Sequence, residues 1–382
     1  MVRRRELFKY EIVMLNEIEI KNFKCFQKAE LKLAPLTLLS GLNSTGKSSV
    51  LQSLLLLRQS YKEGGNIRLN GDLIELGQAL DVFAIDAKND EMGFRLICSD
   101  GSIFRWVNHF DISKDLFTST TTLKDLEKLA LFNDNFHYIS ADRWGPRISV
   151  PLSDFDVHHN NLGKYGEYSI HYLLEQGHKH LKNSDIKLLN EEAGKTLLPQ
   201  VQAWLNDISP GVKIDPKEFK IVNAGTIGFS FPSEVGYSRS FRPTHVGFGL
   251  SYTLPVIIAL LSLPKNGLVI LENPEAHLHP RGQSLMGKLI AHVAAAGTQV
   301  IVETHSDHLL NGVRIAVRDG LLSPKQTALH YFSRNGSVID ITTPQIDVDG
   351  KIDQWPEGFF DESLRNLAAL SSRRRERNTN KT

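Results

Sequence analysis

The stretch Gly41-Leu42-Asn43-Ser44-Thr45-Gly46-Lys47-Ser48 matches the pattern G-x-x-x-x-G-K-[ST] without a mismatch. A short apolar run at 36–39 precedes it and predicts a strand, and the leucine-rich run at 49–59 predicts a helix. A glycine-rich loop between a strand and a helix directs backbone N–H groups and the positive end of the helix at an anion. We therefore predict a phosphate-binding loop in which Lys47 reaches the β- and γ-phosphates and Ser48 holds Mg²⁺. The nucleotide-binding residues expected here are Gly41, Asn43, Ser44, Thr45, Gly46, Lys47, Ser48 and Ser49.

Composition and charge exclude several classes of protein. Of the 382 residues, 41% are hydrophobic and 23% are charged, which is ordinary for a soluble globular chain. The net charge of +1 gives no signal for a nucleic-acid partner. Cys25 and Cys98 match neither a disulfide framework nor the spacing of zinc ligands, so we expect a reducing, cytoplasmic environment. No apolar run reaches the length of a membrane span, which predicts a protein without a membrane partner.

The chain changes character several times along its length, and these changes predict its domain organisation. We expect two halves of one α/β domain with an insertion between them, a disordered N-terminal extension, and a polar, basic tail. The expected bounds are 1–13 for the extension, 14–110 and 241–365 for the two halves, 111–240 for the insertion, which is helical over about 151–215, and 366–382 for the tail.

Apolar periodicity predicts the elements of each half. Alternating residues at 17–23 and 29–33 indicate an antiparallel hairpin, and β-like stretches at 92–98 and 103–106 indicate an antiparallel subsheet. The polar, threonine-rich stretch 111–136 is expected to be mobile. Further strands are expected at 136–139, 219–231, 268–271, 300–303, 328–332 and 338–341. Helices are expected at about 166–206, 251–263, 281–295 and 307–318.

An acid ends one of these apolar strands. The run 267–272 finishes at Glu272, and Glu275 follows three residues later. A carboxylate at a strand end can orient the hydration shell of Mg²⁺, and a second carboxylate can polarise water for in-line attack on a γ-phosphate. We predict that Glu272 is the metal-side acid and Glu275 the catalytic base. Aspartate is more usual at the first position, so Glu272 is a departure that weakens metal coordination.

A histidine, His305, follows the next apolar strand, which runs over 299–303. A single loop histidine more often serves the structure than the chemistry. The phosphate loop and the two acids earlier in the chain favour a functional role here. We predict that His305 contacts the γ-phosphate and completes a catalytic set with Glu272 and Glu275.

Together these motifs resemble the order found in ABC-type ATPase heads, and within them the RecF/SMC/OLD-like branch. Ile20-Lys21-Asn22-Phe23-Lys24-Cys25-Phe26 is similar to the I-x-N-F-[KR]-x-[FL] opening of these heads, and Glu272-Asn273-Pro274-Glu275-Ala276-His277-Leu278-His279-Pro280 is similar to their E-x-P-E-x-x-L-H-P segment. Val246-Gly247-Phe248-Gly249-Leu250-Ser251 departs from the usual L-S-G-G signature. It resembles the V-G-F-G-x-S version of small bacterial AAA-family ATPases associated with anti-phage defence, either Septu-like or retron-associated.

This resemblance implies an α/β fold of the P-loop NTPase type: an ABC-type head with a mixed or parallel core sheet, an antiparallel subsheet and a helical insertion. It also implies a homodimer in which two heads enclose two ATP molecules with Mg²⁺. Gly249 and Ser251 of one subunit would cap the γ-phosphate held by the other. The plainer interpretation of this signature segment is a helix cap whose glycines allow tight packing.

Three further sets of residues stay open. Gln78 is the candidate for sensing Mg²⁺ and the attacking water, although glutamine is often a surface residue. Arg143 and Arg147 are candidates for contacts with nucleotide, with a partner, or with acidic side chains. His277 and His279 are candidates for a zinc site, although the resemblance places them on a loop that faces the second subunit.

The leading hypothesis is an ATPase that dimerises around ATP and controls a separate effector chain, a nuclease or a toxin, in anti-phage defence. About 75 residues follow His305 and their acids are dispersed, so we expect no nuclease module in this chain. One alternative is a RecF-like ATPase that clamps DNA, which keeps a nucleic-acid partner open. The other is a non-hydrolysing, nucleotide-sensing scaffold.

Overall fold

A six-stranded sheet forms the centre of the structure, a computed structural model that describes residues 13–61, 66–109, 116–117, 125–186, 193–336, 338–360 and 362–371. The strand order is β17-β16-β3-β15-β14-β8, and all neighbours are parallel except β16 and β17. Because the parallel strands end at one edge of the sheet, the residues that follow β3, β14 and β15 meet there. The strands are β3 (Leu36–Gly41), β8 (Phe136–Ile139), β14 (Leu268–Glu272), β15 (Gln299–Glu303), β16 (Thr327–Asn335) and β17 (Val338–Thr342).

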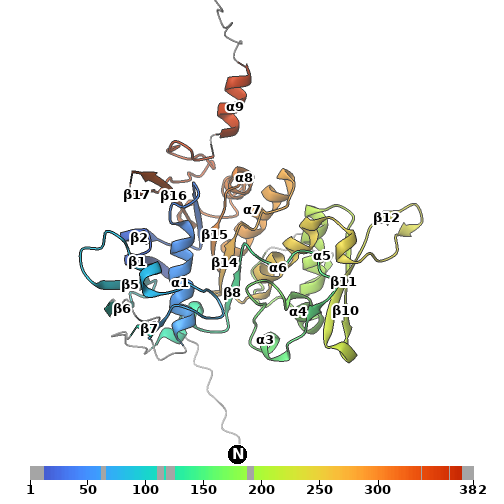
Figure 1. The fold of residues 1–382 in the computed structure, drawn as a ribbon. Helices are drawn as coiled ribbons and strands as arrows, with labels where there is room; N and C mark the ends of the chain where they lie inside the picture. Colours follow the sequence, from blue (N-terminus) through green and yellow to red (C-terminus); the bar gives the residue numbers. More distant parts are fainter. Residues whose placement is uncertain are drawn as a thin grey trace, which may run out of the picture.

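Helices cover both faces of this sheet, which explains why its parallel strands read as continuous apolar runs. Leu38 and Leu39 are neighbours in β3, yet they belong to different hydrophobic clusters. The helix α1 (Lys47–Tyr61) packs on one face, and Figure 1 shows α6 and α7 on the other. The long helices that contribute to the cluster on this second face include α5 (Leu197–Ile208), α6 (Phe248–Ser262), α7 (Pro280–Ala295) and α8 (Asp307–Arg318).

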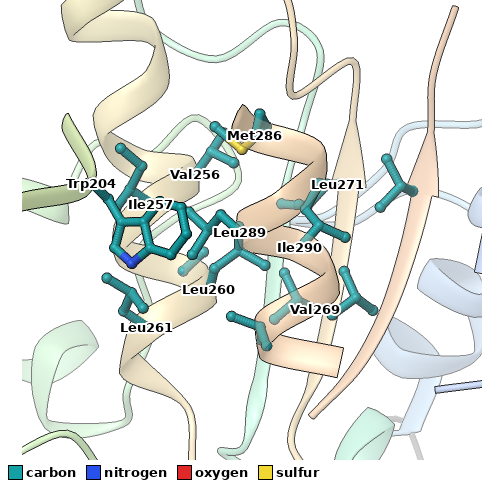
Figure 2. Close-up of a cluster of buried hydrophobic side chains, with 14 of the residues drawn as sticks. Trp204, Val256, Ile257, Leu260, Leu261, Val269, Leu271, Met286, Leu289 and Ile290 are labelled. Atoms are coloured by element: carbon teal, nitrogen blue, oxygen red, sulfur yellow. The ribbon is translucent and has the colours of Figure 1, made fainter. Parts of the chain in front are cut away.

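The hydrophobic cluster on the side of α6 and α7 fixes the position of β14. Figure 2 shows Trp204 of α5 beside α6, with Leu289 of α7 between α6 and the strand residues Val269 and Leu271. Trp204 is only 1% exposed, and both strand residues are fully buried. Burying one such side chain stabilises the fold by roughly 1.5–3 kcal/mol. The same packing therefore holds the end of β14, where Glu272 lies.

The predicted hairpin and antiparallel subsheet form one four-stranded sheet, in the order β2-β1-β5-β6. Its β1–β2 turn supports the phosphate loop, because a Cβ atom on Gly46 would meet Phe26 Cζ at 2.5 Å and Cys25 Sγ at 2.7 Å. Gly46 also has a φ of +99°, so glycine is required there on both counts. The strands are β1 (Leu15–Phe23), β2 (Phe26–Lys32), β5 (Glu91–Cys98) and β6 (Ile103–His109).

The expected insertion contains both helices and strands. Its helical part holds α3 (Asp154–His158), α4 (Ser169–Gln176) and α5, and strands before and after these helices form an antiparallel sheet of order β10-β11-β9. The strands of this sheet are β9 (Val150–Pro151), β10 (Lys213–Phe219) and β11 (Ala224–Ser230). β8 falls inside the expected insertion, but the structure places it at the edge of the central sheet. The core therefore continues to Ile139 before the chain leaves it.

The ends of the chain differ in part from expectation. Val13 is buried and forms a bridge with Leu129, while 1–12 of the expected extension lie outside the described residues. Within the stretch predicted to be mobile, 125–136 packs into the core, and 111–115 and 118–124 lie outside the description. The helix α9 (Glu362–Ser371) covers the first residues of the expected tail, and 372–382 are not described.

The remaining elements are short. They are α2 (Ala79–Val82), the strand pairs β4 (Ile67–Arg68) with β7 (Leu116–Phe117) and β12 (Pro232–Ser233) with β13 (Gly236–Tyr237), and 3-10 turns at Leu126–Lys128, Ala130–Phe132, Lys220–Val222, Pro243–His245 and Pro324–Gln326. Among the described residues, no helix combines the length and the hydropathy needed to cross a bilayer.

Candidate functional site

The predicted phosphate loop connects β3 to α1, as its spacing requires. Lys47 is the first residue of α1 and is 3% exposed. Its Nζ donates to the carbonyl oxygens of Gly41 at 3.1 Å and Leu42 at 2.7 Å, so the ammonium group lies within the loop. Burial lowers the pKa of Lys47, and the negative charge of Glu303 opposes that shift. The loop thus places one cation at the edge where the central strands end.

Glu272, the predicted metal-side acid, ends β14 and is held from the side of β8. Its Oε1 accepts a hydrogen bond from the Tyr138 hydroxyl at 3.0 Å, and its Oε2 accepts one from the Ala141 N–H at 3.0 Å. Burial and then the charge of Glu272 raise the pKa of Tyr138, so this hydroxyl remains a donor at neutral pH. Both carboxylate oxygens of Glu272 therefore have protein donors.

Glu303 lies at the end of β15, beside Glu272 in the strand register. Its Oε1 accepts a hydrogen bond from the Ser48 hydroxyl at 3.1 Å, and its Oε2 is buried without a partner. Burial, followed by repulsion from Glu272, raises the pKa of Glu303 to about 7. The sequence motifs assigned no role to Glu303, although a pattern that could have indicated one is present. The strand 299–303 is apolar and ends in an acid, as the strand 267–272 does.

Glu275, the predicted base, is buried at the same edge of the sheet. Its Oε1 accepts hydrogen bonds from the Thr304 hydroxyl at 2.8 Å and from the His305 N–H at 3.0 Å. Its Oε2 is buried and has no partner among the described residues. Burial raises the pKa of Glu275, whereas these hydrogen bonds and Arg143 lower it. The turn after β15 thus fixes the carboxylate that follows β14.

His305 lies on the same turn, with its side chain exposed. Burial of part of the ring and the positive charge of Lys47 lower the pKa of His305. The influence of Lys47 places the imidazole within electrostatic reach of the phosphate loop. The structure therefore brings the phosphate loop, Glu272, Glu275 and His305 together, and adds Glu303 and Thr304.

The two arginines of the loop after β8 have different environments. Arg143 is buried and donates to the carbonyl oxygens of Tyr252 at 2.8 Å, Glu272 at 2.9 Å and Asn273 at 2.8 Å. Its guanidinium also lies 4.1 Å from the centre of the Tyr252 ring. It therefore ties the end of β14 to α6, through carbonyls and not through acidic side chains. Arg147 is exposed and lies over the Trp144 ring at 3.9 Å.

The signature segment begins α6, three residues earlier than predicted. A Cβ atom on Gly249 would meet the His277 carbonyl oxygen at 2.6 Å, so the plainer interpretation holds for this glycine: it permits tight packing. The His277 ring packs against Phe248 and Tyr252, with centroids 4.5 and 4.8 Å away. The hydroxyl of Ser251 is buried without a partner. The signature segment is therefore tied to the loop that carries Glu275.

The signature segment begins α6, whereas the phosphate loop leads into α1. α6 and α1 belong to hydrophobic clusters on opposite faces of the sheet (Figure 1). Gln78 precedes α2, and its N–H donates to Asp81 Oδ2 at 2.7 Å. Its proposed contact with Mg²⁺ stays a prediction. His279 caps α7, and the described part of the chain holds no cluster of three or more metal-ligating side chains of the His, Cys, Asp and Glu types.

The residues at this edge fit a magnesium–triphosphate complex. Mg²⁺ prefers oxygen ligands and usually takes one or two carboxylates together with substrate phosphates and water. Ser48 and Glu303 supply such oxygens, and the buried, unpartnered oxygens of Glu275 and Glu303 lack the donors that buried carboxylates normally have. A triphosphate would also give the Lys47 ammonium an anionic partner in place of loop carbonyls.

A family model described as "AAA domain, putative AbiEii toxin, Type IV TA system" matches residues 36–311. The chain belongs to this AAA-domain family. A second model, described as "Protein of unknown function (DUF3696)", matches residues 322–370. The family match spans the phosphate loop, both acids of 272–275, and the Thr304–His305 turn.

The chain is similar to a curated protein and to solved SMC head domains. The OLD nuclease of Thermus scotoductus is 22% identical over 334 residues, which cover 77% of this chain and 59% of that protein. The Smc head domain of Pyrococcus furiosus, solved with the C-terminal domain of ScpA, aligns with a TM-score of 0.51 and 11% identity over 94% of this chain and all of that one. The Thermotoga maritima SMC head domain aligns at a TM-score of 0.42, with 12% identity, over 86% of this chain and 98% of that one. The predicted RecF/SMC/OLD-like P-loop head fold is confirmed.

Proposed function

We propose that the protein binds ATP with Mg²⁺ and hydrolyses it at the edge formed by the phosphate loop and the ends of β14 and β15. The observation that carries the proposal is the environment of Glu275, a buried carboxylate with one oxygen fixed and the other free of donors. The fixed oxygen orients the side chain, and the free one is the acceptor for a proton from water. Burial raises its pKa, which makes the carboxylate a better base.

The other residues have binding roles in this proposal. Lys47 binds the β- and γ-phosphates, and His305 contacts the γ-phosphate from the end of the neighbouring strand β15. Ser48 would hold Mg²⁺ and Gln78 would orient the water around the ion, while Glu272 holds the loop after β8 through Tyr138 and Ala141. When bound, Mg²⁺ would neutralise part of the phosphate charge.

We further propose that two heads close around two ATP molecules. The support is that α6, which contains Gly249 and Ser251, and α1, which follows the phosphate loop, belong to hydrophobic clusters on opposite faces of the sheet. The N-terminus of the 15-residue helix α6 carries partial positive charge, which favours an anion such as a γ-phosphate supplied by a second copy. In this arrangement Arg143 and His277 link the signature segment to the catalytic glutamate of the same subunit.

The biological role that we propose is control of a separate effector, a nuclease or a toxin, in anti-phage defence in the cytoplasm. The toxin–antitoxin wording of the family description and the OLD nuclease relative support it. A non-hydrolysing, nucleotide-sensing scaffold is the second candidate. It is favoured by the protein donors on both oxygens of Glu272, which hold that acid on the side of β8.

The test combines binding, turnover and native mass. We expect Lys47→Ala to weaken binding of a fluorescent ATP analogue by at least 100-fold, because the only loop cation is lost. Glu275→Gln is expected to bind ATP and to accumulate as a dimer that wild-type protein forms only transiently. Wild-type protein without turnover in the presence of Mg-ATP, but with nucleotide binding, would favour the scaffold.

A further inference from the structure

We propose that Glu303, and not Glu272, is the protein carboxylate that binds the metal ion of the magnesium–nucleotide complex, with Ser48 as its companion ligand. The inference rests on the proposed ATP site and assigns a residue for which the sequence motifs gave no role. Its central observation is the contact between Ser48 Oγ and Glu303 Oε1, 3.1 Å apart, which joins residues separated by 255 positions in the chain.

The sheet order places Glu303 nearer to the phosphate loop than Glu272. β15 pairs directly with β3, which leads into the loop, and Glu303 lies opposite Leu39 in that register. β14 is one strand further away, on the other side of β15. Adjacent strands are about 4.8 Å apart. A carboxylate at the end of β14 must therefore cross roughly one additional strand spacing to reach an ion on Ser48.

The hydrogen bonds of Glu272 hold it in the opposite direction. Its donors, Tyr138 and the Ala141 N–H, come from β8 and the loop that follows it. β8 pairs with β14 on the side away from β15. Both oxygens of Glu272 are thus held toward the outer edge of the sheet, where they stabilise the loop that carries Arg143.

Glu303, unlike Glu272, keeps one oxygen without a protein donor and directs the other at the phosphate loop. It is 6% exposed, its Oε2 has no donor, and its Oε1 meets the exposed hydroxyl of Ser48. Neighbouring ligands of an octahedral Mg²⁺, each about 2.1 Å from the ion, are separated by roughly 3.0 Å. The observed oxygen–oxygen distance equals that separation within a tenth of an ångström or so, so the two groups can share an ion without rearrangement. The Mg²⁺ would take its remaining ligands from phosphate and water.

The competing explanation is a structural hydrogen bond that only fixes the start of α1. The two explanations differ in their effect on metal dependence. We would measure the affinity of full-length protein for a fluorescent ATP analogue in EDTA and in Mg²⁺. In the wild type, Mg²⁺ is expected to strengthen binding by about tenfold or more.

The variant Glu303→Gln keeps an oxygen for Ser48 and removes the charge. We expect its affinity in EDTA to stay within about twofold of wild type, and the gain from Mg²⁺ to fall below about threefold. The matched control, Glu272→Gln, is expected to keep most of the gain. Circular dichroism and thermal unfolding establish that each variant is folded. If Glu303→Gln does not fold, Glu303→Met, which also removes the carboxylate, replaces it, and an Mg²⁺ gain equal to that of wild type would count against the proposal.

Each outcome has a definite meaning. A full Mg²⁺ gain in Glu303→Gln, or a larger loss in Glu272→Gln than in Glu303→Gln, would overturn the assignment of Glu303 while leaving the ATP site intact. Equal weakening in EDTA and in Mg²⁺ would establish the structural hydrogen bond instead. Wild-type protein that binds no nucleotide at all would overturn both this inference and the proposed function.

Discussion

The ends of β14 and β15 can be compared directly, because each strand is a buried apolar run that finishes in a glutamate. Glu272 has donors on both oxygens, from Tyr138 and Ala141. Glu303 has a single donor, the Ser48 hydroxyl of the phosphate loop. The difference arises from the neighbouring strand, β8 in the first case and β3 in the second. Two strands with the same local pattern thus place their glutamates in different environments. Glu272 supports the loop after β8, and Glu303 faces the phosphate loop.

The largest expected effect concerns Glu275, which follows β14 and accepts hydrogen bonds from the turn after β15. The variant Glu275→Gln should lower ATP turnover by about 10³-fold, since it removes the proposed general base. Its Oε1 can still accept from Thr304 and His305, so nucleotide affinity should stay near that of wild type. Steady-state phosphate release and analogue binding measure the two quantities. Turnover within tenfold of wild type would remove Glu275 from the chemistry.

The next effect concerns the β14 side, where Arg143 donates to four carbonyl oxygens. We expect Arg143→Met to lower the free energy of unfolding by about 3 kcal/mol, because four buried or partly buried carbonyl oxygens lose a donor. Denaturant unfolding monitors the change. The control is Arg147→Met, an exposed position expected to shift stability by less than about 0.5 kcal/mol. Equal effects of the two variants would contradict the assigned difference between the arginines.

A pH experiment tests the β15 side in protein free of metal and nucleotide. The pKa of Glu303 is raised to about 7 from an ordinary value of 4.5, so between these values the folded state binds more protons than the unfolded state. Its contribution to stability is therefore present at low pH and is lost as the pH rises from 4.5 through about 7. Between pH 5 and pH 8 the free energy of unfolding of Glu303→Gln should therefore rise by about 2 kcal/mol relative to that of wild type. Parallel stability curves for both proteins would show that Glu303 does not titrate there.

The smallest effect concerns Tyr138, the hydroxyl donor to Glu272. Tyr138→Phe removes one hydrogen bond from an anionic acceptor while keeping the buried ring, so we expect a loss of about 1.5 kcal/mol in the free energy of unfolding. The Mg²⁺ gain in nucleotide affinity should change little, since Glu272 is held away from the loop. A loss of that gain in Tyr138→Phe would instead place Glu272 among the metal ligands.

Much of the fold could be predicted from the sequence. The phosphate loop, the β1–β2 hairpin, the antiparallel subsheet and the α/β alternation after residue 246 depend on local spacing and periodicity, which a single chain displays directly. The place of β8 was harder to predict, because its strand pattern does not say which sheet it joins. The first turn of α6 was also missed, since Gly247 and Gly249 resemble loop residues.

The sequence by itself determined that a phosphate loop, two acid-ended strands and a histidine turn occur in one chain. Only the tertiary structure decided which acid meets the loop. The chain makes β3, then β8, then β14, then β15, yet the sheet inserts β15 between β3 and β14. Pairing across the sheet is set by packing on both faces and not by order in the chain. For that reason the contact between Ser48 and Glu303 had no local signature.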